Sequence, residues 1–531
     1  MLLRTFILRP SSFILSFALL AVTARAELKL PAIIGDHMVL QQKQTNPIWG
    51  WDTPGTKVTV TFGDQSKSAE AGADGRWTVK LDPVPANAQP QTIKIAGTNE
   101  KDIQDVLVGE VWMCSGQSNM GFTLSRDWNG DLEAAASKID TLRLIKVPNV
   151  GTQELKTDFA GAWKPSDAQS SSTFTAVGFM FGRYLHNILG IPVGLIDNSW
   201  GGSAAEAWIR RDTIEKDPRF SLLMENTHKH EADAQTDKAK ADYETAMTKW
   251  KEDVEKAKAA GKVVPRPPQS PEAWLSGNAR AGNIFAGVVN PTLGYGIKGV
   301  IWYQGESNAN RAYEYAQLFP FMIEQWRKEW QEGDFPFYWV QLADFMAEKP
   351  EPGDSMWAEL RESQTKTMKL PNTGQAVIID LGEGRDIHPR NKHDVAARLV
   401  RWALVKDYGQ KFSYRSPEFN GVEYQGNKAI VSFDCFGSSL YTFDVDEARG
   451  FAVCGEDKVW HWAKGKVLPG NKVEVTSAQV AQPIAVRYAW AENPVCNLYG
   501  ADGLPATPFR TDDFPMITKP APAPAPAAAA K

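Results

Sequence analysis

Apolar runs of strand length alternate with helical patterns between about residues 105 and 405. Residues 191–196, 299–303 and 376–380 have the composition of buried strands, whereas 313–330 and 392–405 show helical spacing of apolar side chains. Strands that alternate with helices predict a parallel sheet with helices on both faces. Because ligands of such folds bind beyond the carboxyl ends of the strands, the polar residues that follow these runs are the first candidates for a site.

Two regions of short strands flank this alternation. Residues 58–62 and 77–81 alternate apolar and polar side chains between turn signals, and residues 429–433, 472–475 and 484–488 form a second β region. We therefore expect an α/β protein in which an α/β domain lies between two β-sandwich-like regions. The expected boundaries are 27–104 for the N-terminal β domain, 105–408 for the α/β domain and 409–518 for the C-terminal β region.

The first 26 residues have the pattern of a secretory signal peptide. Arg4 and Arg9 supply positive charge, residues 13–22 are apolar, and residues 24–26 read Ala-Arg-Ala, a small-x-small cleavage site. The apolar run is short for a membrane span. We expect a secreted or periplasmic protein that starts at Glu27 and is not attached to a membrane after cleavage. Residues 519–531, rich in Pro and Ala, predict a disordered tail.

The net charge and the cysteine content indicate whether nucleic acid, metal ions or disulfides are to be expected. The net charge of −5 gives no electrostatic reason to expect binding to nucleic acid. The sequence has no CxxC and no His-rich pattern, so we expect no metal. Cys114 follows a strand-like run and is expected to be a buried free thiol. In an exported protein one pair among Cys435, Cys454 and Cys496 is plausible, and the sequence leaves the pairing open.

One segment interrupts the alternation of strands and helices. Residues 226–262 are rich in Lys, Glu, Asp and Ala, with Tyr243, Met247, Trp250 and Val254 at helical spacing, and the Pro-rich stretch 264–271 follows. This pattern predicts a solvated amphipathic helix inserted between two strands of the sheet. The alternatives are a lid over a site or an oligomer contact, and the sequence does not fix the oligomeric state.

Residues 109–121, GEVWMCSGQSNMG, have the pattern of a strand that ends in a sharp turn and presents Ser118. Such a turn is often only a turn. A serine becomes a nucleophile when a base takes its proton and N–H groups hold the oxyanion. If Ser118 is a nucleophile, the rest of the chain must supply these two groups.

His388 is the strongest candidate for the base among the seven histidines. It lies in the polar loop 384–390, between an expected strand and a helix, with Asp386 two residues earlier. A carboxylate beside an imidazole fixes its tautomer and stabilises the imidazolium. The alternative is that Asp386 caps the next helix and His388 is an ordinary loop residue. His393, inside the expected helix, is the weaker candidate.

Two further polar loops follow expected strands. In residues 301–308, IWYQGESN, Gln304 or Asn308 could donate a side-chain hydrogen bond to an oxyanion. In residues 198–203, NSWGGS, Gly201 and Gly202 leave backbone N–H groups free. Three polar loops at strand ends, together with a late Asp-x-His, indicate a site more strongly than any one of them.

These motifs also carry a family resemblance. CSGQSNM, SWGGS, IKGVIWYQGESN, WAELRESQ, DIHPRNK and the late RYAW…NPVCNLYGADGLPATPFRTD together resemble the sialate O-acetylesterase family of the SGNH hydrolase superfamily, from about Leu28 to Asp512. The resemblance implies an SGNH-type three-layer α/β/α domain with a parallel sheet, flanked by the β regions. It also implies a serine esterase that removes acetyl groups from sugar hydroxyls without a cofactor.

The resemblance implies a role for each matched position. Ser118 would be the nucleophile, His388 the base and Asp386 its acid partner. The superfamily more often places the Asp three residues before the His, and a Ser–His dyad with a carbonyl is the alternative to a triad. The oxyanion donors would be the N–H of Ser118, the N–H of Gly202 in preference to Gly201, and a side chain, Gln304 first and Asn308 second. The remaining motif positions proposed to bind substrate are Gln117, Trp200, Glu306 and Arg361.

Three alternatives to a sialate O-acetylesterase-like enzyme remain at the level of sequence. One is an acetylesterase that acts on plant or algal polysaccharide, of the acetylxylan type. Another is a carbohydrate-binding protein whose catalytic domain has lost activity, which the joint presence of Ser, His, Asp and QGESN argues against. A third is a glycoside hydrolase that uses paired carboxylates such as Glu306 and Glu359.

Overall fold

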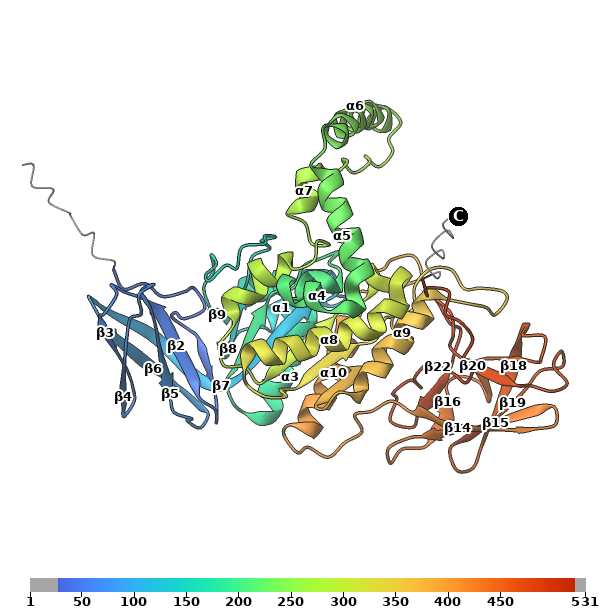
Figure 1. Cartoon of the computed structure of the whole chain (residues 1–531). Coiled ribbons are helices and arrows are strands. Elements are labelled where there is room, and N and C mark those ends of the chain that lie inside the picture. Colours follow the sequence, from blue (N-terminus) through green and yellow to red (C-terminus); the bar gives the residue numbers. More distant parts are fainter. Residues whose placement is uncertain (1–26, 521–531) are drawn as a thin grey trace, which may run out of the picture.

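The computed structural model describes residues 27–520 in three parts that lie side by side (Figure 1). A β domain, coloured blue, is followed by a central α/β domain and a C-terminal β domain, coloured orange to red. The predicted signal peptide, 1–26, and the tail from residue 521 lie outside the described residues. The protein is thus a mixed α/β protein with β domains at both ends.

The central domain is built on parallel strands. Each neighbouring pair is parallel except β8 and β9, which are antiparallel. The strands follow the spatial order β13 (Thr373–Ala376), β12 (Phe337–Val340), β11 (Gly299–Tyr303), β7 (Glu100–Gly116), β10 (Val193–Asp197), β8 (Ile139–Lys146) and β9 (Lys164–Ser166). Since the chain adds strands on both sides of β7, the carboxyl end of β7 lies at the point where ligands bind in open α/β sheets.

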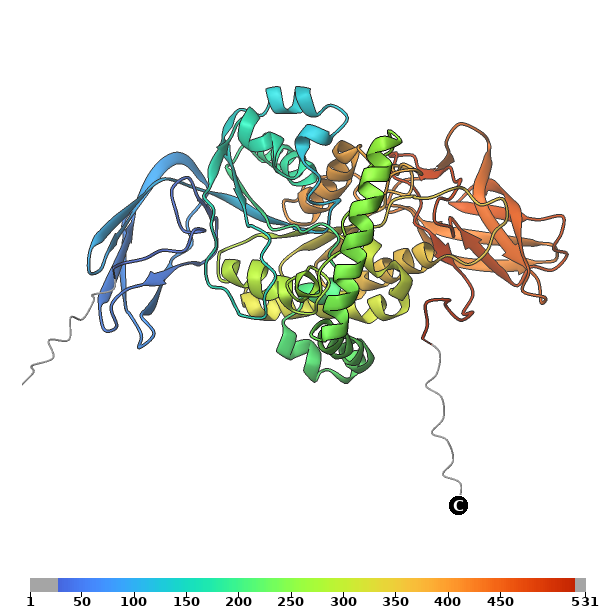
Figure 2. The same cartoon turned by 90° about the horizontal axis from the view of Figure 1, so that it is seen from above.

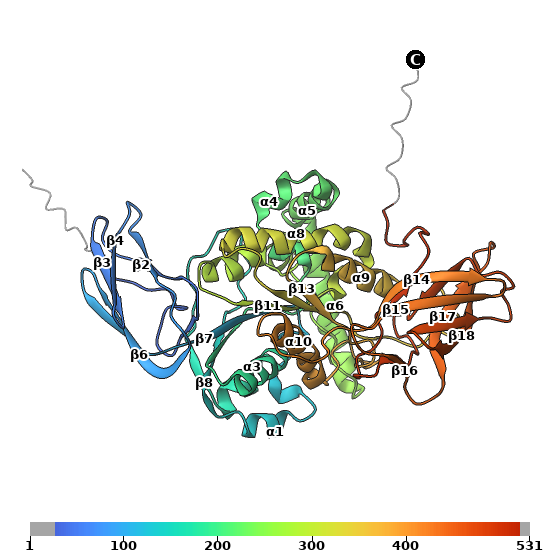
Figure 3. The same ribbon diagram turned by 90° about the horizontal axis from the view of Figure 1, so that it is seen from below.

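Helices cover both faces of these strands (Figure 3). Successive residues of β7 point to opposite faces: Trp112 and Cys114 pack in one apolar cluster, whereas Val111 and Met113 pack in another. The first cluster contains residues of α3 (Ala176–Leu189) and α10 (Lys392–Lys406), and the second contains residues of α8 (Ala312–Trp330) and Trp357 and Leu360 of α9 (Met356–Lys366). Burial on both faces explains why the strand sequences are continuously apolar.

Most expected elements of this domain are found within a few residues of their expected bounds. The expected strand at 376–380 is misplaced, because β13 ends at Ala376. Its last ladder bond joins the Ala376 carbonyl to Gln341 N. Beyond it, the Val377 carbonyl accepts a hydrogen bond from Arg398 Nη1, and Ile378 begins a turn closed by Leu381 N. The apolar run 377–379 is therefore buried loop, a distinction that hydrophobicity does not reveal.

Strand β7 also belongs to the N-terminal domain. Its first half pairs with β6 and β1, and from Glu110 onward it pairs with β10. The expected boundary at residue 104 thus falls inside one continuous strand. At the transition a Cβ on Gly109 would lie 1.9 Å from the Pro192 carbonyl oxygen, so only glycine fits. The strands of the domain are β1 (Val39–Gln41), β2 (Asn46–Trp51), β3 (Lys57–Phe62), β4 (Gln65–Glu70), β5 (Arg76–Leu81) and β6 (Asn87–Ala96).

The C-terminal domain is a nearly closed antiparallel barrel, where the sequence predicted a sandwich-like region. Its sheet begins with β14 and ends with β22, yet Phe419 of β14 stacks on Phe509 of β22 with ring centroids 4.6 Å apart. The two edges therefore meet. The strands are β14 (Glu418–Gln425), β15 (Lys428–Asp434), β19 (Lys472–Thr476), β18 (Trp460–Leu468), β17 (Glu447–Cys454), β20 (Ala485–Tyr488) and β22 (Phe509–Arg510), with β16 (Leu440–Thr442) paired to β21 (Leu498–Gly500).

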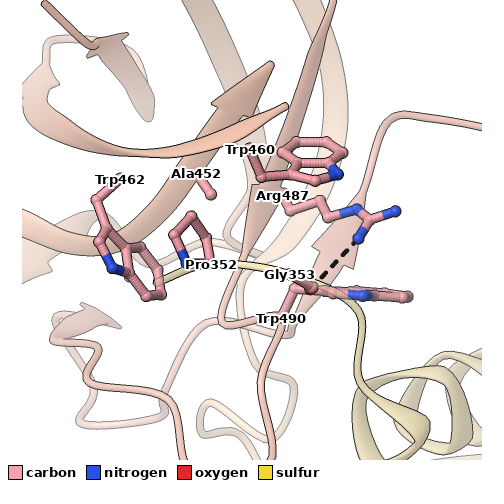
Figure 4. Close-up of a pocket in the computed structure, with 8 residues that line it drawn as sticks. Pro352, Gly353, Ala452, Trp460, Trp462, Arg487 and Trp490 are labelled. Carbon is pink, nitrogen blue, oxygen red and sulfur yellow. Dashed lines mark hydrogen bonds between the residues drawn. The ribbon is translucent and has the colours of Figure 1, made fainter. Parts of the chain in front are cut away.

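A tryptophan-rich joint connects this barrel to the central domain (Figure 4). The guanidinium of Arg487 lies 4.2 Å from the Trp460 ring centroid and 5.2 Å from that of Trp490. Arg487 also forms an ion pair with Asp354, at 2.9 Å, in a loop of the central domain. The space between these side chains is about 10 Å³, room for about one water molecule. The cluster is thus a packed contact and too small to hold a sugar.

The charged insertion forms an arm of two helices and a short third one that stands away from the central domain in Figure 1 and, seen from above in Figure 2, lies over it. These are α5 (Ser221–Ala234), α6 (Asp237–Ala259) and α7 (Pro271–Leu275). The single predicted helix breaks at Gln235, and Thr236 caps α6 through Ala239 N. At the base of the arm, Glu231 binds both Arg211 and Arg280 at 2.8 Å. Most of α6 is exposed, as expected of a solvated helix.

The four thiols are free, since no disulfide joins Cys114, Cys435, Cys454 or Cys496.

The remaining helices are short. No helix within 27–520 has the length and apolarity needed to span a membrane. The short helices are η1 (Leu124–Arg126), α1 (Gly130–Ala135), α2 (Ala168–Ser172), η2 (Ala205–Trp208), α4 (Arg211–Lys216), η3 (Pro218–Phe220), η4 (Phe285–Val289), η5 (Asn290–Thr292), η6 (Glu306–Arg311) and η7 (Thr367–Lys369).

The outer part of the arm is expected to be dispensable for folding. Replacing residues 235–262 with a short Gly/Ser linker removes α6 but keeps Glu231 and its two arginine partners. We expect the thermal unfolding temperature to be nearly unchanged, since α6 buries little of its surface. The circular dichroism should lose only the helical signal of α6 itself. A clear loss of thermal stability would show that α6 packs against the body of the protein in solution.

Candidate active site

The turn after β7 is shaped by Gly116. This residue has a φ of +130°, and a Cβ on it would lie 2.3 Å from the carbonyl oxygen of Tyr303 on the neighbouring strand β11. Any side chain here would push the two strands apart, so glycine is required. The next residue, Gln117, donates its N–H to the same Tyr303 oxygen at 2.9 Å. The turn then presents Ser118, which is only half-buried.

The three polar loops predicted to share one edge of the sheet do meet there. Trp200 N donates to the Gly116 carbonyl at 2.9 Å, which ties the loop after β10 to the serine turn. The Gln117 side-chain oxygen accepts from Gly305 N at 3.2 Å, which ties the turn to the loop after β11. Gln304 Nε2 donates to the Ser203 carbonyl at 3.1 Å and closes the triangle.

His388 lies against Ser118. Its Nε2 is 2.8 Å from Ser118 Oγ, across 270 positions of sequence, and its Nδ1 is 3.3 Å from Asp386 Oδ1. Partial burial lowers the pKa of His388, and the neighbouring carboxylate of Asp386 acts in the opposite direction. The structure therefore joins Ser, His and Asp in the order that nucleophilic catalysis needs, with an imidazole that is neutral at neutral pH.

Asp386 differs from a buried triad carboxylate. Its side chain is 56% exposed, and the Oδ1 that faces the imidazole also accepts the backbone N–H of His388 at 2.9 Å. That backbone hydrogen bond is the main cause of the lowered pKa of Asp386. The two-residue spacing thus folds the carboxylate back onto its own loop. Because water screens exposed ion pairs, its electrostatic effect on His388 is modest.

His393, the weaker candidate for the base, lies elsewhere. Its Nε2 is 3.0 Å from the hydroxyl of Tyr184 on α3, and its Nδ1 is 3.6 Å from Asp394. The structure thus gives His393 other partners and places His388 at Ser118.

Asn119 connects the serine turn to the histidine loop, and sequence reasoning assigned it no role. Its Nδ2 donates to the Ile387 carbonyl at 2.9 Å, one residue before His388, and to Glu306 Oε1 at 2.6 Å. Its Oδ1 accepts from the ammonium of Lys392 at 2.7 Å. The only sequence signal was that Asn119 and Lys392 lie in the quoted motifs GQSN and DIHPRNK.

Lys392 is fully buried beneath this network. Burial lowers the pKa of Lys392 to about 7, against the opposing effect of Glu306. The ammonium also lies 4.9 Å and 5.2 Å from the ring centroids of Phe122 and Tyr303. Burial likewise raises the pKa of Glu306. These groups behave as a hydrogen-bonded structural network, in which Asn119 supplies the amide that all of them share.

Backbone N–H groups beside Ser118 are free to bind an oxyanion. Within residues 27–520, no protein acceptor bonds to the N–H of Ser118, Gly201 or Gly202. Gly201 packs directly on the serine, because a Cβ there would lie 3.3 Å from Ser118 Cβ. Gly202 has a φ of +73°, which suits glycine. Two predicted donors, Ser118 and Gly202, therefore have N–H groups available.

Gln304 and Asn308, the predicted side-chain donors, are already engaged. Both hydrogens of Gln304 Nε2 have acceptors, the Ser203 carbonyl and Asn308 Oδ1, and its Oε1 accepts from the Tyr315 hydroxyl. Asn308 Nδ2 donates to Glu206 at 3.0 Å. Both side chains are buried. In this geometry they brace the loops, and Gln304 has no free donor for an oxyanion.

The four residues predicted to bind substrate differ in burial and in hydrogen-bond partners. Trp200 is half-buried on the loop beside Ser118, whereas Gln117 is buried and braces the turn. Glu306 is held by Asn119. Arg361 is 0% exposed and donates to four carbonyl oxygens, two of them in the segment 491–492. Arg361 has no surface for a substrate and instead connects the central and C-terminal domains.

The structure does not support a glycoside hydrolase in which Glu306 and Glu359 act as paired carboxylates, because both side chains are held by other residues. Glu359 accepts hydrogen bonds from Ile517 N at 2.6 Å and from the Thr518 N–H and hydroxyl, so it anchors the end of the described chain. Glu306 is bound to Asn119 instead. In the described part of the chain, no group of three or more His, Cys, Asp or Glu side chains could hold a metal ion.

The chain is similar to known carbohydrate esterases. The family described as "Carbohydrate esterase, sialic acid-specific acetylesterase" matches residues 272–397. The crystal structure of a carbohydrate acetylesterase from Xanthomonas citri has 35% sequence identity and a TM-score of 0.77, and it covers 92% of this chain and 100% of that one. This chain belongs to the sialate O-acetylesterase family of carbohydrate esterases. The sialate O-acetylesterases of Mus musculus and Homo sapiens are each 29% identical over 91% of this chain, covering 94% and 92% of their own lengths.

The charge of Asp386 should be visible in the pH profile of the esterase. Asp386→Asn keeps an oxygen for the His388 N–H but removes the negative charge that raises the pKa of His388. The pKa of His388 should fall further below about 6.5, so the acid limb of kcat/KM should move to lower pH. The plateau should fall by no more than about tenfold, since an exposed ion pair contributes up to about 1 kcal/mol.

The measurement is kcat/KM for p-nitrophenyl acetate between pH 4 and pH 8. Asp64→Asn, in an exposed turn of the N-terminal domain, is the matched control and should leave the limb in place. A limb that moves to higher pH in Asp386→Asn would contradict the assigned electrostatics.

Asn119 should stabilise the esterase through Lys392. Asn119→Ala removes the acceptor of a buried ammonium, and an unsatisfied buried donor costs on the order of 2 kcal/mol of folding free energy. If Lys392 is the cause, Asn119→Ala/Lys392→Met should lose much less than the two single variants add up to. Urea unfolding followed by circular dichroism measures this. Asn129→Ala, which removes an exposed side chain that makes no capping hydrogen bond to α1, is the control, and additive losses would contradict the coupling.

Proposed function

We propose that this esterase hydrolyses O-acetyl groups on sugars through an acyl-enzyme formed on Ser118. The observation that carries the proposal is the 2.8 Å contact between Ser118 Oγ and His388 Nε2, at the carboxyl end of the central strand of the sheet. A neutral imidazole at this distance can accept the proton of the attacking hydroxyl.

Acylation follows from the positions of these groups. Ser118 Oγ attacks the acetyl carbonyl carbon while its proton passes to His388 Nε2. The negative charge on the carbonyl oxygen is stabilised by the N–H groups of Ser118 and Gly202. The imidazolium, facing Asp386, then gives its proton to the departing sugar oxygen, and the acetyl group remains on Ser118.

Deacylation uses the same groups in reverse. His388 takes a proton from water, the resulting hydroxide attacks the acetyl-serine carbonyl, and the same N–H groups hold the second oxyanion. The ester bond to Ser118 breaks, Oγ regains a proton from His388, and acetate leaves. These residues complete the reaction without a cofactor.

The proposal extends to substrate, fold type and location. Relatives named sialate O-acetylesterase and carbohydrate acetylesterase support an acetylated sugar as the substrate class. The parallel strands, the helices on both faces and the serine at the end of β7 support an SGNH-type three-layer α/β/α domain.

The N-terminal sequence pattern supports export of the protein. N-terminal sequencing of secreted protein tests this: the mature chain should begin at or near Glu27, and an intact Met1 would contradict export.

Ser118 and His388 should act as one catalytic unit. Ser118→Ala removes the nucleophile, and His388→Ala leaves a hydroxyl without its base, so each alone should abolish most turnover of p-nitrophenyl acetate and of acetylated sugars. Because groups that act together are non-additive, the double variant should be about as slow as either single variant. His393→Ala is the matched control and should keep activity. Wild-type turnover by folded Ser118→Ala would reject the mechanism, because a group other than Ser118 would then attack the ester.

A further inference from the structure

Asn278, just after α7 at the base of the arm, contacts the loop that supplies the oxyanion N–H groups. Its Nδ2 donates to the Gly201 carbonyl at 2.5 Å, and its own carbonyl accepts from Ala204 N at 3.3 Å. The two hydrogen bonds hold the loop on either side of Gly202. Neither the family motifs nor the proposed mechanism assigns Asn278 a role.

A bond to the Gly201 carbonyl also fixes the N–H of Gly202. The two groups belong to one planar trans peptide, in which C=O and N–H point in opposite directions. In a Gly-Gly pair this peptide can rotate at low cost, because neither residue has a Cβ to restrict its backbone. A single hydrogen bond to the oxygen therefore selects the direction of the N–H.

The oriented peptide lies at Ser118. Gly201 packs on the serine, with the position of its absent Cβ only 3.3 Å from Ser118 Cβ, while its carbonyl faces Asn278. The Gly202 N–H, which points away from Asn278, has no protein acceptor within the described residues. The loop thus has its carbonyl satisfied and its donor left open, the arrangement that an oxyanion hole needs.

Asn278 is itself held by the arm. Asn283 Nδ2 donates to the Gly277 carbonyl at 2.8 Å, and Arg280 Nη1 donates to the Leu275 carbonyl at 2.9 Å. Arg280 Nε in turn binds Glu231 of α5 at 2.8 Å. These hydrogen bonds support the segment 275–283 on both sides of Asn278.

We propose that Asn278 is a positioning residue that orients the Gly201–Gly202 peptide, so that the base of the inserted arm forms part of the catalytic support. This inference rests on the proposed function of Ser118. It predicts that Asn278 acts on the transition state through Gly202, without touching substrate and without changing the Ser118–His388 pair. The exposed part of the arm, α6, has no share in this role.

The test uses the full mature chain with Asn278→Ala and Asn278→Asp. The first removes the donor, and the second places a carboxylate against the Gly201 carbonyl. Misaligning one of two oxyanion donors should lower kcat for p-nitrophenyl acetate by roughly 10- to 100-fold, with Asp at least as slow as Ala. KM and the acid limb of the pH profile should stay unchanged. Gln235→Ala, which removes an amide-to-carbonyl bond within the arm, should keep wild-type kcat.

Labelling with a fluorophosphonate separates positioning from partial unfolding. In the Asn278 variants every chain should still be labelled at Ser118 at completion, but more slowly, because phosphonylation develops charge on an oxygen in the same hole. Unchanged kcat in both variants would overturn the inference, and so would a loss of kcat that only matches a loss of labelled chains. If Ser118→Ala is inactive while the Asn278 variants are normal, this inference alone fails; if Ser118→Ala is active, the proposed function fails.

Discussion

Strand β7 hydrogen-bonds to β10 on one side and β11 on the other, and it turns at Gly116 where a Cβ would collide with the Tyr303 carbonyl. This close approach sets the position of Ser118, because the turn residues cannot move without separating two buried strands. The same strand continues back into the N-terminal domain, so one sheet connects that domain to the turn that presents Ser118. Ser118, in this turn, is half-buried, and its N–H has no protein acceptor among residues 27–520.

The site is held by a large number of polar groups that never need to touch substrate. Asn119 joins the serine turn to the carbonyl before His388, Gln304 joins the loop after β11 to the loop after β10, and Asn278 also binds the loop after β10. Asn119 and Gln304 are buried, and the amide oxygen and nitrogen of each have hydrogen-bond partners. These bonds explain how loops that are distant in sequence keep Ser118 Oγ and His388 Nε2 at 2.8 Å.

Sequence reasoning succeeded where a local pattern has one physical meaning. Strand–helix alternation predicted parallel strands with helices on both faces, and polar residues after three strands predicted that their loops would meet. Sequence reasoning failed where the hydrogen-bond partners of the backbone determine the structure. The run 377–379 is as apolar as a strand, but Arg398 takes the Val377 carbonyl and the ladder stops at Ala376. The charged insertion was predicted as one helix, yet the helix breaks at Gln235. The strands near the C-terminus were predicted as a sandwich-like region, and they form a nearly closed barrel.

The sequence by itself determined the order of elements and the glycine turn, and it indicated Ser118, His388 and Asp386 as the candidate site, because spacing, apolar periodicity and side-chain type are local properties. Only the tertiary structure decided which amides are free. Gln304 looked like an oxyanion donor until its hydrogens proved to bind Ser203 and Asn308, and Asn278 carried no sequence signal at all. A hydrogen bond between residues 77 positions apart depends on how the chain packs, and no local pattern encodes that packing.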